Sequence, residues 1–87
     1  MSYSIRLSRS AAKALLALSS SDQRRIERAV DALAHQPRPR GAKKLEGGAG
    51  ELRLRVGAYR ILYEVADDVL QVLVLAIGLR KDVYRRR

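Results

Sequence analysis

The 87-residue sequence contains no cysteine, a single histidine and half as many acidic as basic residues. Without cysteine the chain has no disulfide and no thiolate metal site, which is compatible with a reducing cytoplasm. No apolar run approaches the ~20 residues of a membrane span, and no charged-then-apolar leader opens the chain. We therefore expect a cytoplasmic protein with neither a membrane span nor a secretory signal.

The chain also lacks the side-chain sets on which many enzymes rely. With His35 as the only histidine, a histidine pair for acid–base work is excluded, and no Asp/Glu cluster suits a metal ion. His35 comes near the end of a predicted helix, where a cation suits the helix dipole, so we interpret it as structural. The glycines of residues 47–50 precede no Gly-Lys-Ser/Thr and form no P-loop. We expect neither a metal nor a cofactor.

The formal net charge of +9 is the strongest compositional signal. Such an excess points toward nucleic acid or an acidic protein partner. The alternative is a basic surface that only keeps the protein soluble. The length suffices for one domain, residues 1–87, which buries roughly 60–65% of the surface that its unfolded form exposes.

Two segments of alternating polarity, residues 51–56 and 59–65, predict a β-hairpin. Gly57 stands between them where a type II′ turn needs positive φ. This turn places Arg55 directly opposite Arg60. Like charges in that position destabilise a hairpin, and an anion bound between them would relieve the repulsion. The other face of the hairpin is apolar and carries Leu52, Leu54, Val56, Tyr59, Ile61 and Tyr63.

A further strand is predicted over residues 69–77, because this run is too apolar for the edge of a sheet. A two-residue turn at Asp67-Asp68 would join it to the hairpin. Its register puts Val72, Val74 and Ala76 on the apolar face, and Gln71, Leu73 and Leu75 beside the arginines. Leu62, Leu73 and Leu75 then form an apolar patch on the open face, which is typical of a protein interface.

The N-terminal half predicts a short strand and two helices. Residues 3–7 alternate, Ser8 can cap a helix over residues 9–18, and Ser19 or Ser20 can cap a second helix with Ile26, Ala29, Val30 and Leu33 on its buried side. Residues 37–50 are predicted to form one long loop. The order β-α-α-β-β-β predicts a two-layer α+β domain, with a helical hairpin on an antiparallel sheet of strand order 1-4-3-2. In this sheet the first strand runs antiparallel to the last, and one face stays open.

Four segments together resemble the RelE branch of the RelE/ParE toxins: residues 44–47 (KLEG), 52–55 (LRLR), 59–65 (YRILYEV) and 78–84 (GLRKDVY). The resemblance implies a RelE-like fold and a ribosome-dependent endoribonuclease that cleaves mRNA in the A site, inhibits translation and is neutralised by a cognate antitoxin. It also implies contact with 16S rRNA, and a hetero-oligomeric toxin–antitoxin complex that binds operator DNA through the antitoxin.

By position, the resemblance matches four residues to functional residues of the family: Arg53, Arg60, Arg80 and Tyr84. We expect Arg60, Arg80 and Tyr84 to be catalytic. Many relatives carry histidine or lysine where this chain has Leu79, which cannot move a proton. We expect RNA binding from the remaining cations of the site, Lys43, Lys44, Arg53, Arg55, Lys81 and Arg85.

Arginines beside a tyrosine suit phosphodiester cleavage in which the 2′-hydroxyl of the RNA attacks the adjacent phosphorus. Arginine stays protonated, and its planar fork matches phosphate oxygens. Tyr84 starts near a pKa of ~10, and flanking cations favour its phenolate, so it is a candidate acid or base; packing against the sheet is the alternative. Two other functions stay open: a ParE-like gyrase poison, and a non-catalytic module that only binds an antitoxin.

Overall fold

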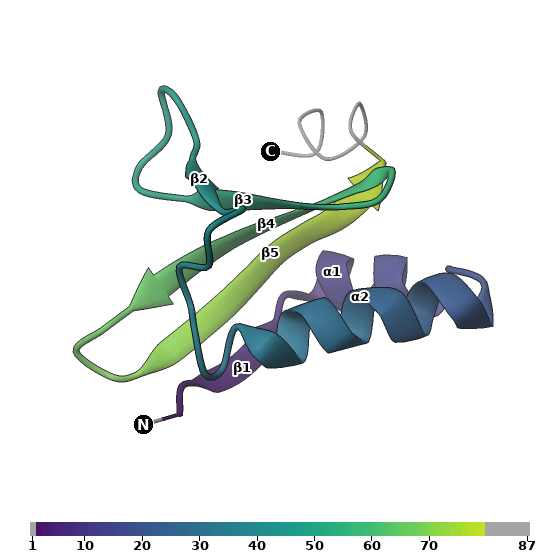
Figure 1. Cartoon of the computed structure of the whole chain (residues 1–87), viewed down its shortest axis with the longest axis horizontal. Coiled ribbons are helices and arrows are strands. Elements are labelled where there is room, and N and C mark those ends of the chain that lie inside the picture. Colours follow the sequence, from purple (N-terminus) through teal and green to yellow (C-terminus); the bar gives the residue numbers. More distant parts are fainter. Residues whose placement is uncertain (1, 80–87) are drawn as a thin grey trace.

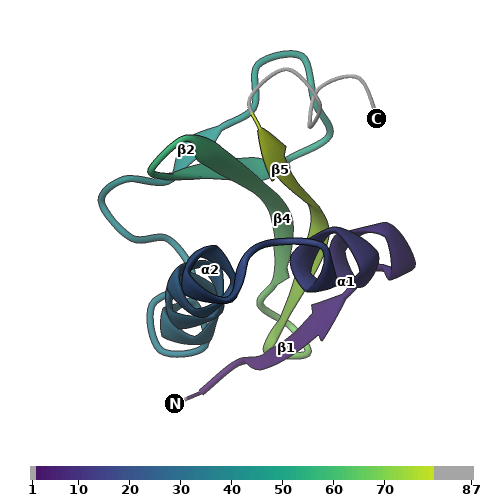
Figure 2. The same ribbon diagram turned by 90° about the vertical axis from the view of Figure 1, so that its right-hand side faces the viewer.

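The computed structural model describes residues 2–79. Two helices lie on one face of a five-stranded sheet, so the predicted two-layer α+β architecture is confirmed (Figure 1). Seen from the side, both helices lie on the same side of the curved sheet (Figure 2). The elements are β1 (Ser4–Leu7), α1 (Arg9–Leu16), α2 (Ser20–Ala32), β2 (Lys43–Lys44), β3 (Leu52–Val56), β4 (Tyr59–Ala66) and β5 (Gln71–Leu79).

Both helices begin at a serine cap. The Ser8 hydroxyl accepts a hydrogen bond from the Ala11 amide at 3.1 Å, and the Ser19 hydroxyl accepts one from the Asp22 amide at 3.3 Å. Neither helix in residues 2–79 combines the length and apolar character needed to cross a membrane. The helices and the sheet enclose the main core, whose buried members are Ala11, Ile26, Val30, Leu33, Ile61, Tyr63, Val72, Val74 and Ile77.

The β3–β4 hairpin has the predicted register. Val56 pairs with Tyr59, and Arg55 pairs with Arg60. Gly57 adopts a φ of +62°, which glycine reaches without the steric cost that a Cβ would add. Since side chains alternate along a strand, this register sends the arginines to the face opposite the helices.

The pairing of β1 corrects one prediction. The observed order, β1-β5-β4-β3-β2, keeps the predicted order of the four expected strands and adds the short β2 inside the expected loop. β2 runs antiparallel to β3 and therefore adds one reversal of chain direction before the hairpin. As a result β1 runs parallel to β5, with Ser4 opposite Gln71, and the predicted antiparallel pairing is wrong.

A bulge in β5 corrects the predicted faces of this strand. Leu62 pairs with Ala76 but Tyr63 pairs with Val74, so Leu75 is the extra residue. Ala76 consequently lies on the open face, and Ile77 occupies the position on the helix face that was predicted for Ala76. The preceding turn is also longer than predicted: it spans residues 67–70 and includes Leu70 at a φ of +51°.

Candidate functional site

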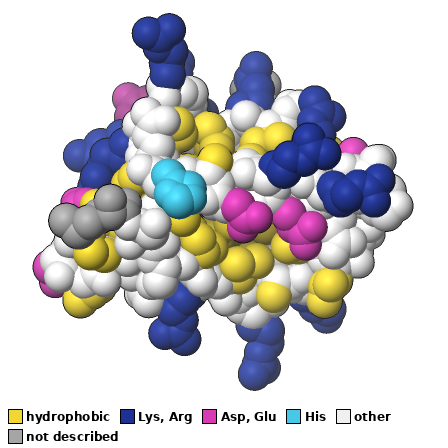
Figure 3. Space-filling model, turned by 60° about the horizontal axis from the view of Figure 1, so that its bottom comes forward, with side chains coloured by type: hydrophobic (Ala, Val, Ile, Leu, Met, Phe, Trp, Pro, Cys, Tyr) yellow, Lys and Arg dark blue, Asp and Glu magenta, His cyan; other side chains and the backbone are white. Residues whose placement is uncertain are grey.

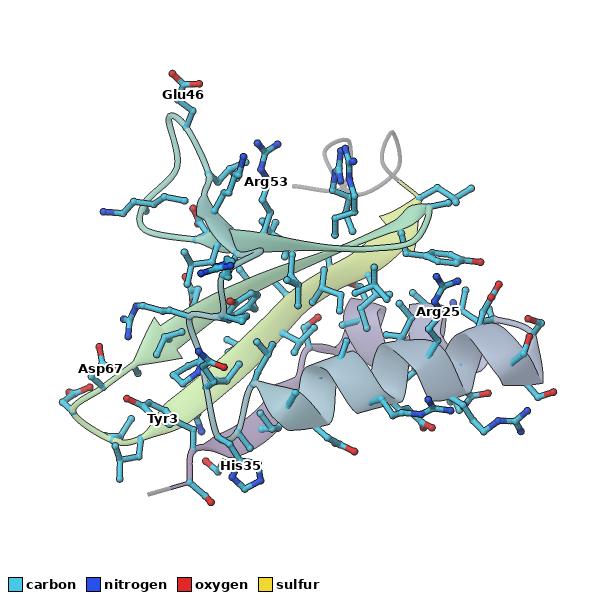
Figure 4. The ribbon with its side chains drawn as sticks, viewed as in Figure 1. Tyr3, Arg25, His35, Glu46, Arg53 and Asp67 are labelled. Atoms are coloured by element: carbon cyan, nitrogen blue, oxygen red, sulfur yellow. The ribbon has the colours of Figure 1, made fainter. Side chains whose placement is uncertain are left out.

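The open face of the sheet contains a hollow of about 340 Å³, lined by Gly41, Lys43, Arg53, Arg55 and Arg60. We call it the arginine hollow. Four of its five residues are predicted site residues, and they come from β2, β3 and β4. Figure 4 shows Arg53 pointing away from the helices. No acidic residue lines the described part of this hollow, so its side chains supply hydrogen-bond donors and positive charge.

Two pairs of like charges face each other in the hollow. Arg55 lies opposite Arg60 across the β3–β4 hairpin, and Lys43 lies opposite Arg53 across the β2–β3 pair. Cations placed directly opposite one another on a sheet destabilise it. The arrangement is therefore better suited to a bound anion than to an empty surface.

Arg60 is the most enclosed of these cations. Only 6% of its surface is exposed, and its Nε is buried without a hydrogen-bond partner among the described residues. Gly78 lies opposite Arg60 on the β5 side, so no side chain crowds the guanidinium from that strand. A buried donor without an acceptor costs about 1–3 kcal/mol, more when it is charged. An anion in the hollow could supply that acceptor.

The loop between β2 and β3 is held by hydrogen bonds to Glu51. The Leu45 amide donates to the Glu51 carbonyl oxygen at 2.8 Å, and the Ala49 amide donates to Glu51 Oε1 at 2.8 Å. Glu51 is 4% exposed, and a Cβ on Gly48 would collide with its carboxylate. Lys44 pairs with Leu52 and is not among the residues of the hollow. The structure thus brings Lys43 into the site and leaves Lys44 outside.

A hydrogen-bond network that the sequence did not predict ties down the segment leading to Gly41. The Tyr63 hydroxyl donates to the Pro37 carbonyl oxygen at 2.7 Å. The Arg38 guanidinium makes two bonds to the Asp67 carboxylate, at 3.1 and 2.8 Å, and the Tyr3 hydroxyl donates to it at 2.6 Å. Figure 4 shows Tyr3 and Asp67 together at one end of the sheet.

Two residues of this network have shifted pKa values, Asp67 and Tyr63. Hydrogen bonds from Arg38 and Tyr3 lower the pKa of Asp67 to about 2. Burial raises the pKa of Tyr63 to about 12. The network joins residues 29 and 64 positions apart in the chain, so no local sequence pattern could have revealed it.

Leu62 lies on the predicted face of the sheet but is not exposed, and Leu79 lies on the opposite face. Leu62 is fully buried in a small cluster with Ala76, Leu45 and Leu75 on the open face, so its predicted role in an exposed patch is wrong. Leu79 pairs with Tyr59 and lines a groove on the helix side of the sheet. Its side chain therefore does not belong to the arginine hollow.

The remaining predicted site residues, Arg80, Lys81, Tyr84 and Arg85, lie outside the described residues. Within residues 2–79, no three His, Asp or Glu side chains gather as ligands for a metal ion. What the described site can do is bind and stabilise negative charge, because guanidinium groups match phosphate oxygens in shape and charge.

Comparisons with known proteins identify the family of this chain. A family model described as the ParE toxin of type II toxin–antitoxin system, parDE, matches residues 5–84. Toxin RelG of Mycobacterium tuberculosis is 34% identical over 61 residues, which cover 70% of either chain. The archaeal RelE–RelB complex from Pyrococcus horikoshii OT3 matches with a TM-score of 0.80 and 30% identity, over 92% of this chain and 97% of that one. A free E. coli RelE mutant matches with a TM-score of 0.77 and 26% identity, over 98% and 93%. The chain therefore belongs to the RelE/ParE superfamily of toxins from type II toxin–antitoxin systems.

Proposed function

We propose that this toxin is an endoribonuclease that cleaves mRNA in the ribosomal A site and so inhibits translation. The observation that carries the proposal is Arg60, a buried guanidinium with an unpartnered Nε facing the like-charged Arg55. A phosphate of the RNA backbone in the hollow would complete the hydrogen bonds of Arg60 and offset the repulsion. The likeness to RelE structures supports the same activity.

In the proposed reaction the 2′-hydroxyl of the RNA attacks the adjacent phosphorus while the bond to the 5′-oxygen breaks. The products are a 2′,3′-cyclic phosphate and a 5′-hydroxyl. Arg60 and Arg53 stabilise the charge that develops on the phosphoryl oxygens, and Lys43 and Arg55 align the backbone. Each preorganised donor of this kind is worth on the order of 10²–10³ in rate.

The C-terminal residues complete the proposed site. Arg80 neutralises charge at the phosphate, and Lys81 and Arg85 bind the flanking backbone. Tyr84 moves the proton between the 2′-hydroxyl and the leaving oxygen, because the side chains that line the described hollow include neither a carboxylate nor an imidazole. Replacing Tyr84 with phenylalanine should then lower the single-turnover rate by roughly 10²-fold.

The proposed partners are the ribosome with its 16S rRNA and mRNA, and a cognate antitoxin. The solved Pyrococcus horikoshii relative is a complex of RelE with RelB, which supports an antitoxin partner for this chain. The net charge of +9 favours acidic partners of either kind. We further propose that the toxin acts in the cytoplasm, and that its hetero-oligomeric complex with the antitoxin binds operator DNA through the antitoxin.

Primer extension on ribosome-bound mRNA after brief expression tests the proposal. The native toxin should produce breaks within codons, and Arg60→Ala should abolish them at an unchanged protein level. Arg28→Ala, which removes an exposed arginine of α2 away from the hollow, is the matched control. A 3′-hydroxyl at the break would contradict attack by the 2′-hydroxyl, and equal cleavage of ribosome-free RNA would contradict the dependence on the ribosome.

A second function is favoured by the description of the family model, which names the ParE toxin. In that case the hollow would serve a gyrase poison and not a nuclease. Gyrase-dependent DNA breakage on expression, without breaks in ribosome-bound mRNA, would establish this alternative.

A further inference from the structure

The bulge in β5 determines which residue faces Arg60. Continued without the bulge, the pairing of β4 with β5 would place Ile77 opposite Arg60. The extra residue Leu75 shifts this register by one residue, and Gly78 faces Arg60 as a result. A glycine within a strand weakens it and commonly marks a place that another group approaches closely. Gly78 therefore leaves room on the β5 side for the guanidinium of Arg60.

The same shift determines the face on which Ile77 lies. In the observed register Ile77 is 4% exposed and belongs to the core under the helices, and Ala76 packs with Leu62 on the open face. Burial of Ile77 favours this register. Without the bulge, its branched side chain would lie on the open face beside Arg60. It would then fill part of the space that the guanidinium occupies.

Ser8 holds the bulge from the start of α1. Its amide donates to the Val74 carbonyl oxygen at 2.8 Å, and its hydroxyl donates to the Leu75 carbonyl oxygen at 2.8 Å. In a regular strand successive carbonyl groups point to opposite edges, so two successive carbonyls can accept from one residue only where the strand is bulged. The Ser10 hydroxyl lies 3.4 Å from the Leu75 carbonyl oxygen, which is a longer and weaker bond.

The place of Ser8 in the chain explains why a hydroxyl is needed there. β1 pairs with β5 as far as Leu7, opposite Val74, and the chain then turns into α1, which packs against β5 (Figure 2). The Ser8 hydroxyl supplies the donor that a longer β1 would have supplied as an amide. Its oxygen also caps α1 by accepting from the Ala11 amide at 3.1 Å. One hydroxyl thus joins the first turn of α1 to the bulge.

We propose that Ser8 is a positioning residue for Arg60: it holds β5 in the bulged register, which keeps a side chain out of the space beside the guanidinium. Ser8 is not among the residues that line the arginine hollow, so it acts through β5. The inference rests on the proposed function for the reaction that Arg60 serves. The connection from Ser8 to Arg60 rests on the hydrogen bonds and the strand register alone.

Four variants separate the bulge from the cap of α1. Ser8→Asp keeps an acceptor for the helix cap but has no hydrogen to donate to Leu75. Ser8→Thr keeps both the acceptor and the donor. Gly78→Val places a branched side chain opposite Arg60 directly. Ser19→Asp makes the same exchange at the cap of α2 and is the matched control. Circular dichroism verifies that each variant is folded.

The first measurement is the single-turnover rate of cleavage of ribosome-bound mRNA. It should fall about 10²-fold in Gly78→Val and about tenfold in Ser8→Asp, because a small misplacement of a catalytic group costs rate of this order. Ser8→Thr and Ser19→Asp should retain the native rate. A native rate in both Gly78→Val and Ser8→Asp would overturn the proposal. So would an equal loss in Ser8→Asp and Ser19→Asp, because the added charge would then explain the effect.

A double-mutant cycle with Arg60→Lys distinguishes positioning of Arg60 from a general loss of structure. Arg60→Lys should lower the rate about 10²-fold in the native toxin but only about tenfold in the Ser8→Asp toxin, because both changes act on the same guanidinium. Effects that multiply to a loss of about 10³-fold would show that Ser8 and Arg60 act independently. That result would overturn the proposal.

Inorganic phosphate gives a readout that does not depend on RNA cleavage. Phosphate in the arginine hollow should stabilise the toxin against urea unfolding, and the concentration dependence gives its Kd. Gly78→Val and Ser8→Asp should raise this Kd about tenfold or more, and Ser19→Asp should leave it unchanged. If the native toxin fails to cleave mRNA while these differences in Kd are found, the nuclease proposal fails and the positioning role of Ser8 stands. Equal Kd values in all four proteins would overturn the positioning role.

Discussion

Arg55 and Arg60 lie directly opposite each other across the β3–β4 hairpin. Lys43 and Arg53 repeat this relationship on the neighbouring strand pair. In the absence of a ligand, each pair places two cations where β-sheets favour opposite charges. The helix-covered face is different: there, lysines and arginines are interspersed with acidic and apolar residues (Figure 3). The facing cations therefore lower the stability of the free protein, and they keep positive charge positioned for an anion.

Removing one member of the facing pair should stabilise the free toxin. We expect Arg55→Thr to raise the free energy of unfolding by roughly 0.2–1 kcal/mol at low ionic strength, because threonine favours strands and no longer repels Arg60. The gain should shrink at about 1 M salt, where the screening length is about 3 Å. Urea unfolding at the two ionic strengths measures both effects. A less stable variant at low salt would show that the repulsion is already relieved within the chain.

The shape of the Arg60 side chain should matter as well as its charge. Arg60→Lys keeps a cation but loses the planar fork that meets two phosphate oxygens at once. We expect the single-turnover cleavage rate to fall about 10²-fold in this variant, with the fold retained. Arg28→Lys makes the same exchange on the exposed surface of α2 and should retain the native rate. An Arg60→Lys toxin as fast as the native one would mean that a point charge suffices.

The features that could be predicted from the sequence depend on neighbours in the chain. Gly57 sets the turn, and the alternation on either side then determines that Arg55 faces Arg60. The caps at Ser8 and Ser19 are equally local, since each hydroxyl bonds an amide three residues later. For this reason the hairpin residues of the arginine hollow, Arg53, Arg55 and Arg60, could be placed on one face from the sequence, whereas the position of Lys43 depends on β2, which was not predicted.

The errors arise where distant parts of the chain decide the structure. A two-residue strand at Lys43–Lys44 has no periodicity to detect, yet it reverses the chain once more and makes β1 parallel to β5. The bulge at Leu75 shifts one residue of β5 and so moves Ala76 to the other face. The polarity pattern of residues 69–77 does not mark the position of this extra residue.

A side chain at Gly57 should destabilise the turn that sets the hairpin register. Its φ of +62° disfavours residues with a Cβ, and a Cβ there would lie 3.1 Å from the Arg25 guanidinium. Figure 4 shows Arg25 extending from α2 toward the sheet. We expect Gly57→Ala to lower the free energy of unfolding by roughly 1–2 kcal/mol, as measured by urea unfolding. Adding Arg25→Ala should remove the contact but recover only a minor part of the lost free energy of unfolding, because the backbone strain remains. Complete recovery would show that the contact with Arg25 accounts for the whole loss.

Tyr63 should make stability depend on pH in the alkaline range. Burial raises its pKa from 10.0 to about 12, so the unfolded chain releases this proton before the folded protein does. The stability that this pKa shift contributes is fully present below pH 10 and is lost between pH 10 and 12. Above pH 12 the free energy of unfolding no longer changes with the titration of Tyr63. By linkage this loss is roughly 2–3 kcal/mol.

Tyr63→Phe provides the comparison that isolates this effect from other groups that titrate in the same range. The variant should be less stable at neutral pH by about 1–3 kcal/mol, because the Pro37 carbonyl loses its donor. Its stability should then fall less steeply than that of the native protein above pH 10, so that the two curves converge toward pH 12. Urea unfolding at intervals of pH measures this difference. Parallel curves would show that burial does not raise the pKa of the Tyr63 phenol in the folded protein.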